Sequence, residues 1–573
     1  MINIKNKRQN YLPGLEPWRN IYSPRKLKLL ENSWAEVFRK YILPLLPAEQ
    51  IFHLYSSHRG RPTKELYSTI GAVVLQQFFD LTDSETIKEL AFNELWHFAL
   101  DCFDEDNQLI SEKTLWTMRN QLVELGLSEQ IFSVATDHLI KYFNVDISKQ
   151  RIDSVHVHSN MARLGRIRIL GRTIIKFLKN LKRQHIEIFN AEISSEMQTK
   201  YLKKSGDSYF GQLKPSESER NLTTLANDMY SLISIFSSET IVSNMTSFKL
   251  LLRVFSEHCY VENEQVEVKS SKEVSSDSVQ NPSDPDSGYD GHKGQGFQTQ
   301  IMETYSSKED KEDKKMDAGK NDNGKEETNA NKPILNLITY SETESAAKHD
   351  SHALKPALEN LQERGLKSEK VVGDTLYASD KNKEIAKNFG VKLIAPTPGK
   401  ASKKGFDKFN IDSDNFEIVS CQWNKEPDVI KHNKKGSISL FWNKSTCANC
   451  PFADSCPAKK CRKGRKITYR KESIKFFLRR QYEASLEFKD EYRYRSGIEA
   501  TNSRFIHMTG ARRLRYRGLE KMRFGQKLRA LAINVFRTTK YLRKIGKFFN
   551  ILFFPTNIAI FSFEINSKLK IAA

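Results

Sequence analysis

The chain lacks the features that hold a protein in a membrane or suit it to an oxidising compartment. No run of about 20 apolar residues occurs along its 573 residues, so no segment should span a bilayer. The first residues contain no apolar stretch of the kind that a secretory signal needs. There are only 7 cysteines, and four of them fall between residues 447 and 461, which is not the pattern of a disulfide framework. We therefore expect a cytoplasmic protein.

Acidic residues are too few to balance the basic ones. The chain has 91 Lys and Arg against 70 Asp and Glu, a formal net charge of +21. This excess favours a polyanionic partner, because binding releases the partner's counterions. We expect DNA, and with it an association with the nucleoid; a basic protein without such a partner is the plain alternative. Hydrophobic residues make up 39%, and the length implies roughly two to four domains.

Three acidic residues stand where a charge needs an explanation. Asp153 and Asp374 each lie in a short apolar, β-branched run, where a carboxylate is costly unless something pairs it. Glu499 lies in a strongly basic stretch with helical patterning. Two strand carboxylates and one helix carboxylate could hold a pair of Mg²⁺ ions. Such a pair stabilises both oxygens of an in-line phosphoryl displacement.

The neighbours of Glu499 add to this interpretation. Tyr492, Arg495, Glu499 and Asn502 are spaced 3, 4 and 3 residues apart, so a helix would place them on one face. These side chains could bind a metal, clamp a phosphate and pack against a sugar. A solvated helix face with a local Glu–Arg pair is the alternative.

A dense basic tract follows, in residues 510–518. Its arginines are Arg512, Arg513, Arg515 and Arg517, and further basic residues come soon after, at Lys521, Arg523, Lys527 and Arg529. Arginine suits bidentate contact with phosphate. We expect this tract to hold the DNA backbone rather than to read the base sequence.

Four cysteines have the spacing C-x2-C-x5-C-x4-C. They are Cys447, Cys450, Cys456 and Cys461, and together they could close a tetrahedral Zn²⁺ site. Such a site would be structural, because four thiolates leave no open position for catalysis. A reduced, metal-free cluster is the alternative.

Four aromatic residues have two possible roles each. His156 and His158 follow Asp153 closely and could contact a metal or a phosphate, but a strand-end histidine with its own hydrogen bonds is more common. Trp423 and Trp442 could stack on an unpaired base. Core packing is the better interpretation for both.

Residues 20–145 have the pattern of an all-helical domain. Leu66, Ile70, Val74 and Phe78 recur every four residues and mark one apolar helix face. Further on, Thr82 and Glu85 have capping-box spacing, Ser111 is a candidate N-cap, and Gly126 is a candidate stop. Short helices of this kind could form a helix-turn-helix DNA binder or a small bundle without that role.

Residues 146–396 alternate between strands and helices, which predicts an α/β sheet with parallel members. We expect strands over 149–157, 296–302, 334–339, up to Asp374 and over 391–395, with helices over 351–364 and 379–388. A helical insertion should occupy about 161–260, and the charged stretches 264–287 and 306–331 should be disordered loops. The chain then continues with a Cys-rich insertion (397–475), final helices (476–545) and a tail (546–573).

Several of these segments resemble a known family. Residues 151–154, 373–379 and 492–503 resemble the three signature blocks of prokaryotic insertion-sequence DDE transposases, and the closest group is the insertion sequence 1182 type. Residues 510–518 resemble the segment after the family glutamate, and 291–297 and 447–451 are also family-like. Residues 59–125 resemble the helical N-terminal domain of these enzymes. The likeness extends over most of residues 20–540.

The resemblance implies a ribonuclease H-like catalytic core with Asp153, Asp374 and Glu499 as its metal-binding triad. It also implies an insertion between the last core strand and the glutamate helix. Such an enzyme binds the ends of its own element as a dimer and cuts the phosphodiester with water activated by two Mg²⁺ ions. The freed 3′-hydroxyl then attacks target DNA, and Arg495 would position a phosphate near the reaction centre.

One departure from the pattern concerns a DNA contact. Related families carry a lysine seven residues after the glutamate, and here that position is Ile506. The contact is therefore lost or falls to Arg504 or His507.

Two rival functions remain. One is a nuclease on the same fold that cuts DNA without joining it. The other is a non-catalytic DNA-binding protein derived from a transposase. An intact carboxylate triad argues against the second, because a protein that only binds DNA would gain from losing negative charge beside it.

Overall fold

The structure is a computed structural model, and it describes residues 2–4, 16–56, 60–161, 164–203, 218–307, 333–400, 404–433, 436–513 and 515–546. The expected charged loop 306–331 lies outside the described residues from residue 308 onward, and so does the expected tail 546–573 from residue 547 onward. No helix among the described residues is long and apolar enough to cross a membrane.

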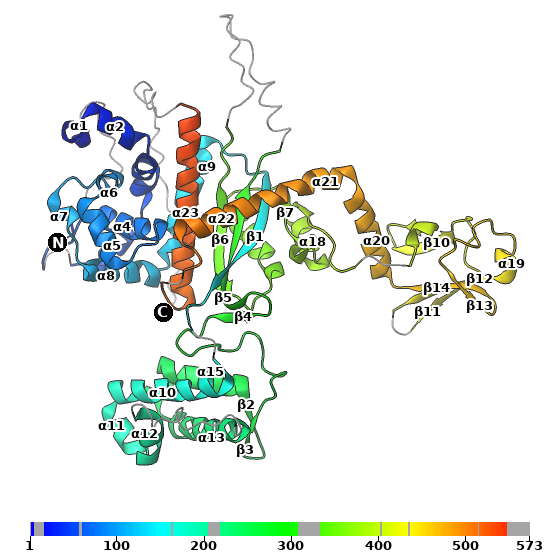
Figure 1. Ribbon diagram of the computed structural model, residues 1–573, viewed down its shortest axis with the longest axis horizontal. Coiled ribbons are helices and arrows are strands. Elements are labelled where there is room, and N and C mark those ends of the chain that lie inside the picture. The colour runs from blue at the N-terminus through cyan, green and yellow to red at the C-terminus, as the bar shows by residue number, and fades with distance from the viewer. Residues whose placement is uncertain are drawn as a thin grey trace, which may run out of the picture.

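The N-terminal part consists of short helices on one side of the molecule (Figure 1). They are α1 (Pro17–Ile21), α2 (Pro24–Glu31), α3 (Trp34–Val37), the short turns η1 (Phe38–Ile42), η2 (Leu43–Leu45) and η3 (Ala48–Leu54), α4 (Leu66–Phe78), α5 (Asp83–Phe92), α6 (Glu94–Leu100), α7 (Glu105–Gln108), α8 (Glu112–Glu124) and α9 (Leu127–Phe143).

Local signals in the sequence fix several ends of these helices. Thr82 and Glu85 form the expected capping box of α5. Ser111 caps α8, and Gly126 follows that helix with a left-handed φ of 64°. The apolar stripe expected on α4 is only part of its buried surface. Every residue of α4 is buried, because the helix runs through the middle of the helical part.

A six-stranded mixed sheet forms the centre of the molecule. Its order is β4 (Gly288–Asp290), β5 (Gly294–Thr304), β1 (Lys149–His158), β7 (Lys370–Val372) and β8 (Lys392–Ile394), and β6 (Ile338–Ser345) also pairs with β5. Strands β1, β7 and β8 are mutually parallel, as expected, whereas β5 runs antiparallel to β1 and β6. Strand β6 begins four residues later than the sequence predicted.

Helices cover the sheet and join it to the N-terminal part. Two turns and two helices connect β6, β7 and β8. They are η7 (Asp350–His352), α17 (Leu354–Glu363), η8 (Thr375–Tyr377) and α18 (Asp380–Asn388). The long helix α23 (Leu519–Lys544) runs between the N-terminal helices and the sheet (Figure 1). Its buried Asn534 accepts from Ile338 N at 2.7 Å and donates to Ile338 O at 2.8 Å, so one side chain satisfies both backbone groups at the start of β6.

A helical insertion with its own core projects from the sheet, within the expected range 161–260. It contains α10 (Arg166–Gln184), α11 (Ile186–Glu192), α12 (Ser195–Leu202), α13 (Ser218–Phe236), α14 (Thr240–Ser243) and α15 (Thr246–His258), followed by the hairpin β2 (Cys259–Glu262) and β3 (Gln265–Val268).

The stretch 264–287 is ordered, which differs from the disordered loop that its composition predicted. It contains β3 and a series of turns in which Val279, Asn281 and Asp284 are buried. Two of its acidic residues have partners at the start of α23: Asp284 accepts from Gly518 N at 3.0 Å, and Asp286 accepts from Leu519 N at 2.9 Å. These carboxylates therefore lie at the N-terminus of α23, where negative charge is favourable.

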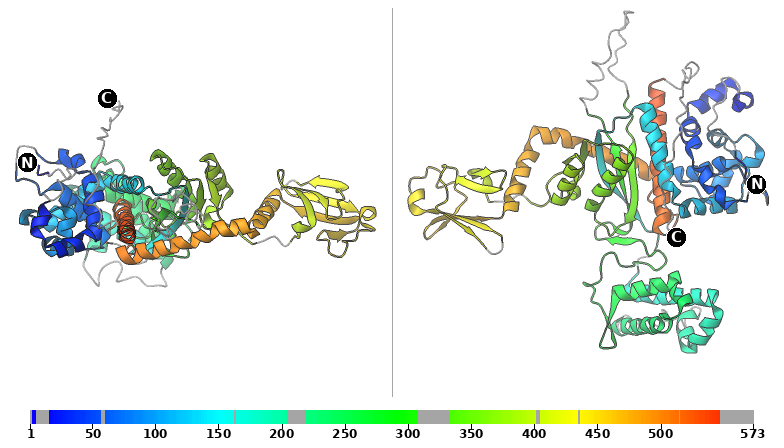
Figure 2. Two further views of the ribbon diagram at one scale, coloured as in Figure 1. Left: turned by 90° about the horizontal axis from the view of Figure 1, so that it is seen from above. Right: turned by 180° about the vertical axis from the view of Figure 1, so that it is seen from behind.

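The Cys-rich insertion lies far from the sheet, at the other end of two helices (Figure 2). It contains the turn η9 (Phe406–Lys408), the hairpin β9 (Phe409–Asp412) and β10 (Glu417–Cys421), and a four-stranded sheet of β11 (Val429–His432), β12 (Ile438–Asn443), β14 (Gly464–Tyr469) and β13 (Lys459–Cys461), with α19 (Lys444–Cys447). The chain returns through α20 (Lys471–Ala484), α21 (Leu486–Tyr492), the turn η10 (Arg493–Ser496) and α22 (Gly497–Thr509).

Candidate active site

The three carboxylates come from three elements that meet at one end of the parallel strands. Asp153 lies within β1, whereas Asp374 lies two residues beyond the end of β7, because this strand ends before the expected position at Asp374. Arg151 pairs with Val372 across these strands, so Asp153 and Asp374, each two residues further along, lie at the same level. Glu499 lies in the first turn of α22, which packs against β1.

Arg495 links two of the carboxylates. Its Nη2 atom donates to Asp153 Oδ2 at 3.3 Å, and its Nη1 atom donates to Glu499 Oε1 at 2.6 Å. Asn502 Nδ2 donates to the same Asp153 oxygen at 3.1 Å. The residues expected on one helix face therefore do converge, although residues 492–502 form the end of α21, the turn η10 and the start of α22 rather than one α-helix.

Negative charge exceeds positive charge around Asp153. Burial raises the pKa of its carboxyl to about 6, and Asp374 and Asp350 add to the rise, while Arg495 and the Ser154 N–H oppose it. The side chain of Asp153 is only 13% exposed, whereas that of Glu499 is 63% exposed. Asp153 is therefore shielded from solvent, while Glu499 is open to it.

Asp374 is fixed by its own turn. Its Oδ1 atom accepts from Leu376 N at 2.8 Å and so caps η8. Below it, the Tyr377 ring is wholly buried, and its hydroxyl donates to Gln300 Oε1 at 2.7 Å. Burial raises the pKa of Tyr377 well above its ordinary value, and nearby carboxylates, Asp374 among them, add to the rise. The Tyr377 hydroxyl therefore stays protonated and uncharged beside these carboxylates.

A fourth acid, Asp350, escaped the sequence analysis. It lies in η7, is buried, and accepts from Ser154 Oγ at 3.0 Å and from Gln300 Nε2 at 2.9 Å. Its sequence neighbours are polar, so no apolar run marks it as a costly charge. Only the fold brings it beside Asp153.

A second carboxylate network holds α22 in place. Glu303 on β5 is wholly buried, and it pairs with Arg151 at 2.6 Å and with Arg537 at 2.7 Å. Thr501 Oγ1 on α22 donates to it at 2.7 Å. Burial tends to raise the pKa of Glu303, but the charges of Arg537 and Arg151 outweigh this and lower it.

The network around Glu303 requires a glycine at Gly497, the first residue of α22. A Cβ atom at this position would come within 2.0 Å of Arg151 Nη1. Arg151 also donates to Tyr494 O at 2.7 Å, so its guanidinium fills the space beside the start of the helix.

The remaining DNA-contact candidates divide into exposed and internal residues. Arg504, Arg512, Arg513 and Arg517 are exposed. Tyr492 instead packs in the site, stacked on Phe488 with ring centroids 5.5 Å apart. Ile506 packs against the hydrophobic core, so the position that carries a lysine in related families points inward here.

Arg515 and the basic residues on α23 have partners inside the molecule. Arg515 and Arg529 both pair with Asp80 of the N-terminal part at 2.8 Å, and Arg529 is buried. Lys527 pairs with Glu129 and Glu342, and Arg523 pairs with Glu342 at 2.6 Å. In the structure these residues contact carboxylates of the protein itself, and the DNA contact expected of Arg515 stays a prediction. These contacts hold α23 against the rest of the protein.

The two histidines lie at the far end of β1, with ring centroids 4.6 Å apart. His156 is buried, and its ring nitrogens have no hydrogen-bond partner in the described part of the chain, so it is not the satisfied histidine that was expected. Burial lowers its pKa to about 4, and His158 adds to this effect. Of the two tryptophans, Trp442 is a core residue, as expected, while Trp423 is half-buried.

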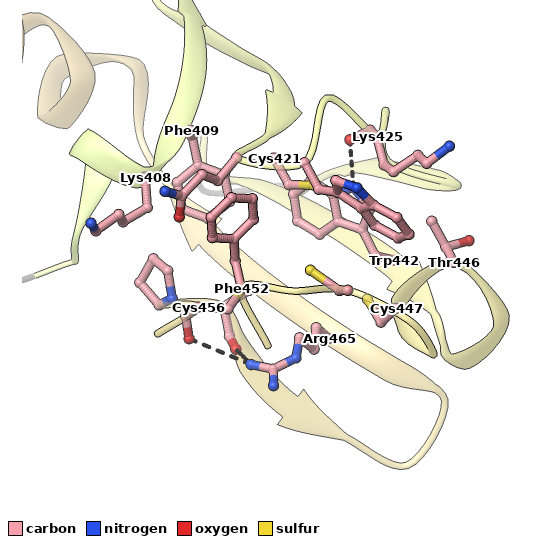
Figure 3. Close-up of a pocket in the computed structure, with 15 residues that line it drawn as sticks. Lys408, Phe409, Cys421, Lys425, Trp442, Thr446, Cys447, Phe452, Cys456 and Arg465 are labelled. Atoms are coloured by element: carbon pink, nitrogen blue, oxygen red, sulfur yellow. Dashed lines mark hydrogen bonds between the residues drawn. The ribbon is translucent and has the colours of Figure 1, made fainter. Parts of the chain in front are cut away.

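The structure separates the four cysteines that the spacing grouped together. Cys447, Cys450 and Cys456 line one small cavity with Cys421 (Figure 3). Cys461 does not line it; it lies on β13 and is exposed.

The donor set at the acidic site suits a divalent cation. Carboxylate oxygens are the ligands that Mg²⁺ prefers, and the surplus negative charge around Asp153 is what a cation would neutralise. Asn502 Oδ1 is a further buried oxygen without a partner among the described residues. These residues are not preassembled, however. Among the described residues, no three His, Cys, Asp or Glu side chains form a ready metal-binding group, and at this site Arg495 bonds to both Asp153 and Glu499.

Two family models match the chain. Residues 24–121 match the model described as Transposase domain (DUF772), and residues 420–539 match the model described as Transposase DDE domain. The first match covers most of the N-terminal helices, and the second contains Glu499, α22 and the larger part of the Cys-rich insertion. Neither a curated protein nor a solved structure matches the chain.

Proposed function

Because the two matches identify this chain as an insertion-sequence DDE transposase, we propose that it cuts DNA at the ends of its own element and joins the freed 3′-hydroxyl to target DNA. The insertion sequence 1182 type fits the motifs. Transposase DDE domains have a ribonuclease H-like fold in general. We assign such a core to the central sheet with α22, an end-binding role to the N-terminal helices, and a separate domain to the Cys-rich insertion.

One observation carries the proposal: Asp374 lies level with Asp153 on the neighbouring strand, and Glu499 shares Arg495 with Asp153, although the three are far apart in sequence. The shared register of β1 and β7 aligns the two aspartates, and Arg495 and Asn502 tie α22 to Asp153. In our proposal these three carboxylates hold two Mg²⁺ ions. Bound there, the ions would stabilise the attacking and leaving oxygens of the displacement.

The other residues of the site position DNA and the catalytic groups. Arg495 is the guanidinium nearest the carboxylates, and we assign it the contact with a DNA phosphate. Asn502 orients Asp153, and the network around Glu303 holds the helix that carries Glu499. The exposed arginines, Arg504, Arg512, Arg513 and Arg517, would follow the phosphate backbone. Joining two ends requires that they be held together, so we propose a homodimer on DNA.

The test uses isosteric amides. Asp153→Asn, Asp374→Asn and Glu499→Gln should each abolish Mg²⁺-dependent cleavage of element-end DNA while leaving end binding intact, because the amide keeps the shape and loses the charge that holds the ion. Asp490→Asn is the matched control, since this carboxylate on α21 is 59% exposed and pairs only locally, with Arg493 at 3.0 Å. Near-normal cleavage by one of the three variants would remove that residue from the triad.

Two assays separate the rival functions. Pre-cleaved ends with free 3′-hydroxyls are mixed with a target plasmid, and strand transfer is measured. Cleavage without transfer would favour a nuclease. Failure of the wild-type protein to cut any element end in Mg²⁺ would favour a DNA-binding protein.

A further inference from the structure

Four thiols surround one cavity in the Cys-rich insertion. The cavity has a volume of about 30 Å³, and its walls include Cys421, Cys447, Cys450 and Cys456 (Figure 3). Phe409 and Trp442 form an apolar wall beside them. Cys421 stands well before the other three in the sequence and does not belong to the spacing pattern that suggested a metal site.

The fold brings Cys421 to this cavity through a tight turn. Cys421 ends β10, opposite Phe409 on β9. The chain then turns, with Asn424 N donating to Cys421 O at 2.9 Å and Asn424 at a left-handed φ of 56°. Lys425 O accepts from Cys421 N and from Trp442 Nε1, both at 3.0 Å. The buried Trp442 therefore fastens the Cys421 turn to β12.

The other three cysteines lie at the end of α19 and in the loop after it, and Arg465 holds this loop. Cys450 N donates to Cys447 O at 3.4 Å, which closes the turn of the C-x2-C pair. The Arg465 guanidinium, from β14, donates to the backbone oxygens of Ala453 at 2.5 Å, Ala458 at 3.2 Å and Cys456 at 3.4 Å. The Arg465 guanidinium is therefore bound to the backbone of the loop that carries the thiols.

Cys461 does not line this cavity. It pairs with Gly464 across β13 and β14, and it is exposed.

We propose that Cys421, Cys447, Cys450 and Cys456 form a four-thiolate structural zinc site, and that Cys461 is not a ligand. Such a site would join the β9–β10 hairpin to the loop after α19 and so fix two separate parts of the insertion. The sulfur atoms must turn inward when the metal binds, because no three metal-ligating side chains among the described residues are preassembled. The proposal is independent of the proposed function, since it concerns metal content and folding only.

The experiment compares two single substitutions in the full-length protein. Wild type should carry about one zinc per chain by the four-ligand rule. Cys421→Ser should lose most of this zinc, while the matched control Cys461→Ser should keep it. With Co²⁺ in place of zinc under reducing conditions, wild type and Cys461→Ser should give the same thiolate-to-metal absorption, and Cys421→Ser should give a weaker band.

A second variant separates loss of a ligand from misfolding. Cys421→His replaces one zinc ligand with another and should retain the metal with a shifted Co²⁺ spectrum. Chelation of the wild type should expose 397–475 to protease before the rest of the chain, because metal binding and local folding are coupled. Zinc retained by Cys421→Ser, zinc lost from Cys461→Ser, or a folded wild type that takes up neither metal would each overturn the proposal.

Discussion

Asp153 and Glu303 lie on neighbouring strands and both contact α22, but the protein surrounds the two carboxylates with different charges. Glu303 lies directly across from Arg151, two residues before Asp153 on β1. It receives two guanidinium groups and a hydroxyl, and its pKa falls although it is wholly buried. Asp153 shares one guanidinium with Glu499, and burial raises its pKa, to which Asp374 and Asp350 nearby add.

The difference indicates which carboxylate has a structural role. The protein fully compensates Glu303, as expected for a buried charge that holds elements together. It leaves Asp153 short of positive charge, as expected where a cation from outside completes the site. Opposite consequences should follow when each charge is removed.

The largest effect on stability should come from Glu303→Gln. Removing this charge leaves Arg151 and Arg537 buried without a counter-charge, and breaking such a buried pair typically costs about 3–5 kcal/mol. Asp153→Asn, in contrast, removes a desolvated charge that its acidic neighbours disfavour. We expect its midpoint of thermal unfolding to equal or exceed that of the wild type. Calorimetry of the two variants measures both effects.

Two outcomes would contradict this comparison. One is an Asp153→Asn variant less stable than wild type, and the other is a Glu303→Gln variant as stable as wild type. Glu491→Gln serves as an intermediate reference, because Glu491 pairs with Lys370 at 2.8 Å and Lys392 at 2.7 Å in a more exposed place.

The pH dependence of the Glu303→Gln effect follows from the direction of the pKa shift. The folded protein holds the Glu303 carboxyl at a pKa below its ordinary value of 4.5, so the unfolded chain binds this proton more readily. The stability that the charge contributes is therefore fully present above pH 4.5 and is lost as pH falls through the folded pKa. The difference in unfolding free energy between wild type and Glu303→Gln should be constant above this pH and narrow below it. A gap that widens on acidification would show that the pKa is raised.

A smaller effect is expected where the two carboxylate networks meet, at Gly497. Gly497→Ala should displace Arg151, and overpacking of this kind typically costs about 1–3 kcal/mol, partly offset by up to about 1 kcal/mol from the better helix propensity of alanine. Glu499 lies two residues further along α22, so the shift should also displace this carboxylate. The cleavage rate should therefore fall further than the loss of folded protein alone would explain. Gly291→Ala is the control, since nothing lies within 4 Å of its Cβ position. Cleavage by Gly497→Ala at the wild-type rate would show that α22 tolerates the shift.

The features that the sequence predicted well have local signals. The capping box of α5 depends on residues three apart, and β1, which carries Asp153, and β7, which precedes Asp374, show as short apolar runs. The contact between Arg495 and Glu499 is also local, because the two residues lie four apart. Such signals do not depend on the rest of the fold.

The features that were missed depend on partners distant in sequence. Lys527 and Arg529 follow the basic tract in the sequence, and only the fold shows that Glu129 and Asp80 lie beside them. Asp350 has no apolar neighbours to mark it, and the acids of 264–287 look disordered until they cap α23. Spacing alone also favoured Cys461, because nothing local shows that a hairpin brings Cys421 to the same cavity.

The smallest expected effect extends the comparison to positive charges, within the basic tract. Arg515 pairs with Asp80, whereas Arg512 and Arg513 have no ion pair with any residue that the structure describes. Arg512→Gln and Arg513→Gln should each weaken binding to all duplexes alike and reduce the slope of log affinity against log salt by about 1, with little change in stability.

Arg515→Gln should instead cost up to about 1 kcal/mol of stability, as for a partly exposed ion pair, and leave the salt slope close to that of wild type. Binding titrations at several salt concentrations, together with thermal unfolding, measure both quantities. If Arg515→Gln reduced the salt slope as much as Arg512→Gln does, Arg515 would leave Asp80 for a phosphate when DNA binds. Selective loss of affinity for the element's own ends in Arg512→Gln or Arg513→Gln would make this tract a reader of bases rather than of the backbone.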